Sequence, residues 1–327
     1  MSLVKQSLDG TQLSKCADIN SDGNINILDI VIVVKQIIGG NEETVIDPND
    51  FVSVWKITKD DNKITIPTVP GLRYNYTIDW GDKSDIKHIT TGENPFHEYS
   101  DQFFEDKETV NVTITISITD IEEGAFPRIK FAGSGQQSKI IAIPSLGAVG
   151  WTSFDQAFDG CSNLVEIHGG DLSKVTSTYR MFREATNAVP DTSEWDVSSV
   201  TNMREMFYRA SSATPNTTNW DVSSAQNFYM MFRDAVSANP DVKYWNTRNV
   251  TTMHSMFRGA TSATPDTSGE DWVTTMVTSM REMFMSATNA NPDTANWDTS
   301  KVKDMREMFS NAVNARPTTW NLCCHGM

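Results

Sequence analysis

The stretch that decides the fold is VTNMREMFYRASSATPNTTNWDVSS, residues 200–224, because close variants of it begin at Val175, Val250, Val277 and Val302. Each variant contains a Met-Phe pair, a proline eight residues after the phenylalanine, and then a tryptophan. A repeat of about 25 residues predicts a solenoid in which each unit packs only on its two neighbours.

The spacing inside a unit predicts its local structure. Val200, Met203 and Phe207 stand three or four residues apart, which is the spacing of one helical face, and the proline then ends that helix. The segment from proline to tryptophan is two residues longer in residues 265–272 and two residues shorter in residues 317–320. Because packed elements do not tolerate such slips, we expect a surface loop there. The sequence therefore predicts an α/β unit repeated roughly six times.

Stacking of the units places equivalent residues in columns. The Met, Phe and Trp columns are predicted to form the core. Arg183, Arg233 and Arg258, each one residue after a phenylalanine, are predicted to lie on a solvated face, and no column marks one face of the solenoid as unusual. The residues after the prolines are predicted to bond to loop backbones rather than to bind cations or sugar hydroxyls. They are Asp191, Asn216, Asp241, Asp266 and Asp293.

Residues 18–29, DINSDGNINILD, have the spacing of a calcium-binding loop rather than of a plain Asn/Asp-rich turn. Calcium takes six to eight oxygen ligands on a flexible loop, with a glycine at the sharp turn, here Gly23. The apolar segment that follows, through Ile38, predicts a helix. These residues resemble a dockerin-type half-repeat, which implies an EF-hand-like loop and helix and binding to a cohesin. The predicted Ca²⁺ ligands are Asp18, Asn20, Asp22, Asn24 (through its carbonyl), Asn26 and Asp29.

Residues 51–144 have the pattern of a β-domain. Runs such as NKITIPTV and VNVTITIS alternate or are rich in β-branched residues, and turn residues separate them. Trp80, Gly81 and Asp82 of IDWGD, with His97 and Tyr99 of HEY, resemble an immunoglobulin-like domain of the polycystic-kidney-disease (PKD) type, which implies a β-sandwich. His97 and Tyr99 are predicted to be structural, with the ring in the core and the polar tip bonded to a loop.

Residues 151–175 form an atypical first unit with the pattern AF-x-x-C-S-x-L-x-x-I, which begins at Ala157. This pattern resembles the BspA-like leucine-rich repeat. The later units, with their MF pair and W-D-x-S, resemble the divergent branch of that family found in bacterial surface proteins and lipoproteins. The resemblance spans residues 51–320 and implies a secreted or cell-surface location and a role in adhesion.

The composition excludes several classes of function. A net charge of −15 over 327 residues disfavours a nucleic-acid partner and favours divalent cations. No apolar run reaches the roughly 18 residues of a membrane helix, and the first residues contain no signal-peptide core. Cys16, Cys161, Cys323 and Cys324 are too few for a disulfide scaffold, and Cys161 is predicted to be buried. The catalytic motifs of metalloproteases, phosphate-binding loops and nucleophile elbows are missing, so a non-enzymatic protein is predicted.

These observations predict a multidomain α+β protein. The predicted parts are a dockerin-like calcium module in residues 1–45, a PKD-like β-sandwich in residues 46–145 and a leucine-rich-repeat-like α/β solenoid in residues 146–327. The expected function is adhesion or recognition at the cell surface, with a protein or glycan of the cell surface or matrix as ligand. Two alternatives remain open. One is a self-assembling filament, virion or cell-surface layer protein whose copies stack end to end, and the other is a dockerin-type subunit of an extracellular enzyme complex.

Overall fold

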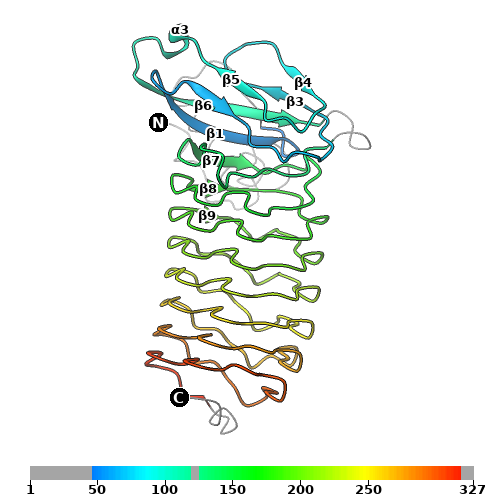
Figure 1. Ribbon diagram of the computed structural model, residues 1–327, viewed down its shortest axis with the longest axis vertical. Helices are drawn as coiled ribbons and strands as arrows, with labels where there is room; N and C mark the ends of the chain where they lie inside the picture. The colour runs from blue at the N-terminus through cyan, green and yellow to red at the C-terminus, as the bar shows by residue number, and fades with distance from the viewer. Residues whose placement is uncertain (1–45, 119–124, 318–327) are drawn as a thin grey trace, which may run out of the picture. The chain divides into compact units, whose positions relative to one another are not determined.

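The computed structural model describes residues 46–118 and 125–317 of the chain (Figure 1). The predicted calcium ligands Asp18, Asn20, Asp22, Asn24, Asn26 and Asp29, the helix expected after them, and Cys16, Cys323 and Cys324 lie outside the described residues. The regular elements are β1 (Phe51–Thr58), β2 (Lys63–Thr65), β3 (Tyr76–Asp79), β4 (Lys87–Ile89), β5 (Phe96–Glu98), α3 (Asp101–Phe104), β6 (Thr109–Ser117), β7 (Ile140–Ser145), β8 (Glu166–Ile167) and β9 (Val189–Pro190).

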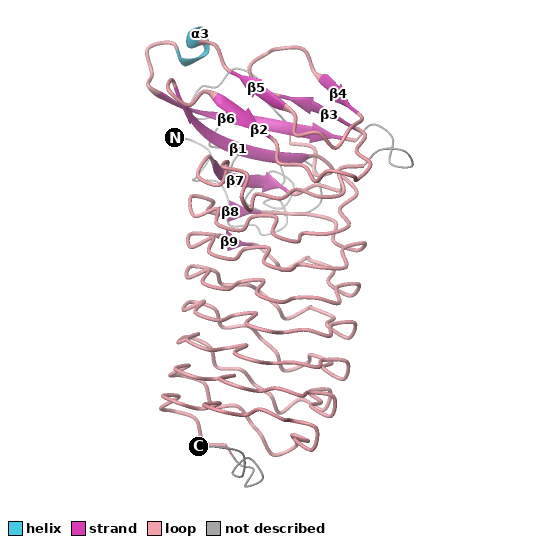
Figure 2. Ribbon diagram, in the orientation of Figure 1, coloured by secondary structure: helices cyan, strands magenta, loops and turns pink. Residues whose placement is uncertain are grey.

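The described chain is largely non-helical (Figure 2). One mixed seven-stranded sheet runs in the order β4-β3-β6-β1-β7-β8-β9, and β2 and β5 form a separate two-stranded sheet. β1 pairs antiparallel with both β6 and β7, whereas β7, β8 and β9 pair in parallel. The sheet therefore passes without a break from the antiparallel β-rich part into the first coils. Among the described residues, no helix is both long and apolar enough to cross a membrane.

The β-rich part packs around aromatic rings. Phe51 of β1 contacts Phe126 at 5.9 Å and Trp151 at 5.5 Å between ring centroids, so one core joins β1 to the first coil. His97 and Tyr99 are structural, as predicted: His97 stacks on Trp80 and its Nε2 lies 2.6 Å from Asp82, while the Tyr99 hydroxyl donates to the carbonyl of Trp80 at 2.8 Å. Both rings thus stabilise the turn that carries the WGD segment.

From residue 151 each repeat unit forms one coil, and the coils stack (Figure 1). Parallel bridges join equivalent residues of successive coils, for example Asn202 to Asn227 and Thr252 to Ser279. The phenylalanine rings of neighbouring coils lie 5.5–5.7 Å apart from Phe158 to Phe309. The predicted Met, Phe and Trp columns are buried, and so is Cys161. The core of stacked columns predicted from the repeat is therefore confirmed for the described units.

The helix predicted in each unit is wrong, and the coils are not the α/β units of a leucine-rich repeat. The N–H groups of Arg180, Phe182 and Glu184 donate to carbonyls of the next coil at 2.8–3.0 Å, whereas those of Met181 and Arg183 donate to carbonyls three residues back. An α-helix needs every N–H to donate four residues back, with negative φ throughout. Here Arg180 and Glu184 have φ of 56° and 58°, so the segment is a series of tight turns.

The same turn geometry recurs along the stack. Positive φ occurs at two positions of each coil, two residues before and two residues after the phenylalanine, as at Glu205 and Arg209. Successive turns, like a helix, bring residues three or four apart to one side, which explains why the spacing of Val200, Met203 and Phe207 suggested a helix. The hydrophobic pattern therefore predicts the buried residues correctly and the backbone conformation wrongly.

The loop between proline and tryptophan is held by hydrogen bonds within and between coils. Asp191 Oδ1 accepts from the Ser193 N–H at 3.1 Å, and each of the other predicted column residues accepts from the backbone two residues on. The buried Thr192 and Thr217 hydroxyls donate to carbonyls of the next coil, both at 2.7 Å. The interpretation of this column as a support for the loop backbone is confirmed. In the long loop the backbone at Gly269 lies so close to the Lys243 carbonyl that any side chain there would collide with it. The loop fits because this residue is a glycine.

A glycine substitution separates the turn structure from a helix. Ser286 has φ of 59° and Ser310, at the neighbouring position of the next coil, does not have positive φ. A left-handed conformation costs a non-glycine residue about 1–2 kcal/mol. Glycine avoids this cost, but it increases the conformational entropy of the unfolded chain, which lowers stability by about 0.4–1 kcal/mol. Ser286→Gly should therefore raise the free energy of unfolding by about 0.5–1 kcal/mol, and the matched control Ser310→Gly should lower it. Denaturant unfolding measures both, and equal losses from the two substitutions would contradict the turn assignment.

Candidate functional site

Comparing the units position by position shows that the core positions are constant, whereas positions in the loop between proline and tryptophan and positions around the Met-Phe pair vary; the latter are the ones whose side chains contact one another across coils. The residues three and two before, and one and two after, the phenylalanine change from coil to coil, although Met and Phe between them are constant. The first of these positions, for instance, is Tyr179, Arg204, Tyr229, His254 and Arg281 in successive coils. We call this set the variable face: residues 179, 180, 183, 184, 204, 205, 208, 209, 229, 230, 233, 234, 254, 255, 258, 259, 281, 282, 285 and 286.

The backbone explains why these side chains reach the surface. The turns direct the Met and Phe side chains into the core, where Met206 and Phe207 are fully buried. The flanking residues project from the same turns on the other side, so Arg204 and Tyr208 are half-buried. Other members of the set, such as Glu205 and Glu282, are buried beneath the arginines with which they pair.

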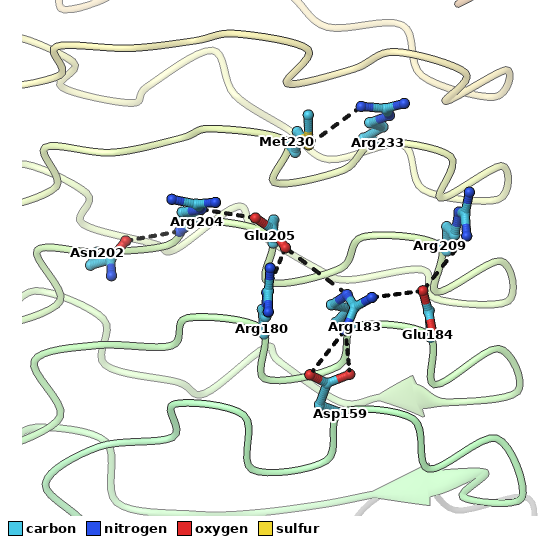
Figure 3. Close-up of polar contacts among 10 residues, drawn as sticks. All are labelled: Asp159, Arg180, Arg183, Glu184, Asn202, Arg204, Glu205, Arg209, Met230 and Arg233. Atoms are coloured by element: carbon cyan, nitrogen blue, oxygen red, sulfur yellow. Dashed lines mark hydrogen bonds and ion pairs between the residues drawn. The ribbon is translucent and has the colours of Figure 1, made fainter. Parts of the chain in front are cut away.

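Glu205 is the centre of an ion-pair network that joins three coils (Figure 3). Its carboxylate accepts from Arg180 Nε at 2.6 Å and from Arg204 Nε at 2.8 Å, and Arg183 Nε lies 4.0 Å away. Only 6% of its side chain is exposed. Burial alone would raise the pKa of Glu205, but the hydrogen bonds from Arg180 and Arg204 outweigh burial and hold that pKa below its ordinary range.

A second centre of the same kind lies three coils further on. Glu282 pairs with Arg258 and with Arg281, whose Nε lies 3.0 Å away, and accepts from the Ser255 hydroxyl at 3.1 Å. Burial acts to raise the pKa of Glu282, and the hydrogen bonds from the two arginines lower it on balance. Arg258 was predicted to lie on a solvated face and is instead held between coils. The solvated-face prediction is likewise wrong for Arg183 and Arg233, whose side chains are only 29% and 19% exposed.

Arginines and aromatic rings alternate along the first column of the variable face. The Arg204 guanidinium lies 5.5 Å from the ring centroid of Tyr179 and 4.7 Å from that of Tyr229. The ring of Tyr229 in turn stacks on His254, with centroids 4.9 Å apart. Such cation–π and ring contacts are each worth about 0.5–1 kcal/mol at exposed sites. From Tyr179 to His254 the column thus forms a strip of planar groups that contact one another.

Tyr208 is surrounded by arginines from three successive coils. The guanidinium groups of Arg183, Arg209 and Arg233 lie 5.8, 5.1 and 5.6 Å from its ring centroid. Glu184 lies beside this cluster, 3.0 Å from Arg183 and 3.6 Å from Arg209 (Figure 3). The cluster places charged donors and acceptors close together around one half-buried phenol.

Arg183 links the Tyr208 cluster to the preceding coil. Its Nη1 lies 3.4 Å from both carboxylate oxygens of Asp159. Burial raises the pKa of Asp159, and the nearby Arg183 charge only partly offsets that effect. Arg183 therefore donates hydrogen bonds to two carboxylates, those of Asp159 and Glu184, whereas Arg209 lies 3.6 Å from Glu184 and 4.0 Å from Asp234.

The sequence identified these residues one by one but not as a site. Tyr208 interrupts the column of Arg183, Arg233 and Arg258 in the sequence, and in the structure it is the residue that neighbouring arginines contact. The signal was the variation itself, because positions that differ between otherwise constant units are not fixed by the stack. Within residues 46–118 and 125–317, no group of three His, Cys, Asp or Glu side chains could hold a metal ion.

Residues 152–270 and 238–323 match the profile of a family described as "Mycoplasma protein of unknown function, DUF285". The two matches overlap and together extend over residues 152–323, which is more than half of the chain and coincides with the coils. No curated protein and no solved structure matches the chain.

The Glu205 network predicts a defined acid dependence of stability. Because the folded-state pKa of Glu205 lies below its ordinary value of about 4.5, ionised Glu205 stabilises the fold at neutral pH, and this contribution is lost as the pH falls below that value. Glu205→Gln should lower the free energy of unfolding by about 1–3 kcal/mol at neutral pH and by less at about pH 3. The exposed Glu270→Gln is the control. The free energy of unfolding is measured with denaturant at each pH. If its dependence on pH is the same in Glu205→Gln as in the native chain, Glu205 does not have this role.

Proposed function

The chain belongs to the family described as "Mycoplasma protein of unknown function, DUF285", and we propose that it is a non-enzymatic recognition or adhesion protein that binds its ligand through the variable face of its coils. The observation that carries the proposal is the contrast between a constant core and a variable face whose arginines, acids and rings contact one another from coil to coil. Repeat stacks commonly present extended surfaces of this kind to their partners. The family match covers the coils, which is the part of the chain that bears this surface.

The ion pairs support the proposal because they order the variable face before any ligand arrives. Arg180, Arg204 and Arg183 are long side chains that lose rotamer freedom on binding, at about 0.5–1.5 kcal/mol each. Their contacts with Glu205 and with the tyrosine rings already restrict that freedom. An ordered polar surface favours selective binding over loose attraction. A row of similar coils also spreads its side chains along a surface, whereas catalysis requires convergence in one cleft.

The setting that we propose is the outside of the cell, with calcium bound by residues 18–29. The loop spacing supports calcium, and the likenesses of the coils to BspA-like repeats, of residues 51–144 to a PKD-type domain and of residues 18–29 to a dockerin-type half-repeat support the location. These finer assignments are part of the proposal. With these assignments, we propose that the β-rich part and the coils are both exposed at the cell surface.

Tyrosine substitutions test whether the variable face binds. Tyr229 lies on it, between Arg204 and His254, whereas Tyr244 is 72% exposed and lies outside it. Binding of the full chain to an array of immobilised glycans and matrix proteins is the measurement. Tyr229→Ala should weaken binding to the recognised array component by about tenfold, as expected for an aromatic contact near the centre of an interface, and Tyr244→Ala should not. Equal binding by both variants would contradict the proposal.

Calcium binding is tested by titration calorimetry with CaCl₂. The full chain should bind calcium, and Asp18→Ala combined with Asp22→Ala should abolish that binding because two charged ligands of the loop are removed. Asp191→Ala is the matched control, since that carboxylate accepts from a loop N–H in the coils.

Light scattering with calcium and then with chelator also tests the alternative of self-assembly. Large particles that dissociate on chelation would favour assembly over recognition by a monomer.

A further inference from the structure

Two arginines of the Tyr208 cluster have hydrogen-bonding capacity that the described protein does not use. Arg209 is 54% exposed and lies 3.6 Å from Glu184 and 4.0 Å from Asp234, beyond hydrogen-bonding distance. Arg233 Nε is buried without a hydrogen-bond partner among the described residues, and its Nη1 donates only to the thioether of Met230 at 3.4 Å. A guanidinium has five N–H donors, and a thioether is a weak acceptor.

The two guanidinium groups also share a single carboxylate. Asp234 Oδ2 lies 3.5 Å from Arg233 and 4.0 Å from Arg209, and both arginines lie beside the ring of Tyr208. The coils that carry them are joined by a hydrogen bond from the Arg209 N–H to the Arg233 carbonyl at 2.8 Å. Arg209 is exposed and hydrogen-bonded to neither nearby carboxylate, and Arg233 Nη1 has only a thioether as acceptor, which favours a further oxyanion. Carboxylate and sulfate both match the planar, forked geometry of arginine.

The surroundings of the pair indicate what carries that oxyanion. Glu184 and Asp234 lie among the arginines, so a densely charged polyanion would be repelled, as it would be by the net charge of −15. Sugar hydroxyls both donate to carboxylates and accept from arginines, which suits this mixture of groups. A peptide partner ordinarily contributes apolar anchors, but the exposed large apolar side chains of the described residues lie outside the variable face. The chemistry therefore favours a glycan with widely spaced acidic groups.

We infer that the Tyr208 cluster binds an acidic glycan, with one carboxylate or sulfate held by Arg209 and Arg233 and neighbouring hydroxyls bonded to Glu184 and Asp234. This inference rests on the proposed function and names its ligand class. It differs from general adhesion in locating recognition at one group of side chains on three adjacent coils. The anion takes the place of solvent at the exposed Arg209 guanidinium, whereas the buried Arg233 Nε stays beside Asp234 and Arg233 contributes its charge.

Titration calorimetry of the full chain at low ionic strength tests the inference. The acidic probes are octasaccharides of hyaluronan, which carries carboxylates, and of chondroitin sulfate, which also carries sulfates. Maltooctaose is the neutral control, and octaglutamate represents an acidic peptide. Arg209→Gln alone and combined with Arg233→Gln should weaken binding of an acidic octasaccharide, by about tenfold or more in the double variant. Arg248→Gln, which removes the same charge at an exposed site paired with Asp271, is the matched control and should bind as the native chain does.

Each outcome decides the inference. Saturable binding of an acidic octasaccharide that is lost in the Arg209 and Arg233 variants and retained in Arg248→Gln supports it, and the stronger of the two probes distinguishes sulfate from carboxylate. An equal loss of binding in Arg248→Gln would show general charge attraction and overturn the inference. Tighter binding of octaglutamate than of the octasaccharides would also overturn it, and so would a failure of both acidic octasaccharides to bind. Thermal unfolding verifies that the variants remain folded. If the double variant does not fold, the single variant Arg209→Gln, which changes an exposed side chain, still tests the inference. The array experiment with Tyr229→Ala then decides separately whether the proposed function also fails.

Discussion

The structure depends on the hydrogen bonds that pass from each coil to the next. Alternate N–H groups around the Met-Phe pair, such as those of Arg180, Phe182 and Glu184, donate to the following coil, and the groups between them close tight turns. Backbone polar groups in a buried segment must be paired, so this alternation fixes the register of every coil. The longer step from Phe257 to Phe284 keeps the register, because Thr252 still pairs with Ser279 and the added residues lie in the loop.

This register separates the side chains that must be constant from those that can differ. Inward residues meet the same residue of the next coil, and Phe207 stacks between Phe182 and Phe232 at 5.6 and 5.5 Å. A change of volume in one coil would therefore disturb two neighbours. Outward residues on the variable face meet different partners in each coil, and ion pairs such as Arg180–Glu205 connect the coils as the phenylalanines do inside. Stability and surface diversity are thus supplied by opposite sides of the same turn.

The fold was predictable from the sequence where burial alone decides it. The repeat period predicted the stack, the constant Met, Phe and Trp positions predicted the core, and the slips between proline and tryptophan predicted a loop. The backbone of the unit was not predictable, because residues spaced like Val200, Met203 and Phe207 share a side in a helix and in successive turns alike. What distinguishes the two is where Glu205 and Arg209, with positive φ, turn the chain, and no residue type there required it.

The candidate site divides in the same way. The sequence by itself determined that Tyr208 and the arginines occupy variable positions in a repeat with a constant core, and it determined the spacing from which a calcium loop is predicted. Only the tertiary structure decided that Arg183, Arg209 and Arg233, from three coils, meet at one tyrosine ring. The reason is that contacts across coils depend on the lateral offset between turns. That offset follows from hydrogen bonds between segments about 25 residues apart, which no local sequence pattern specifies.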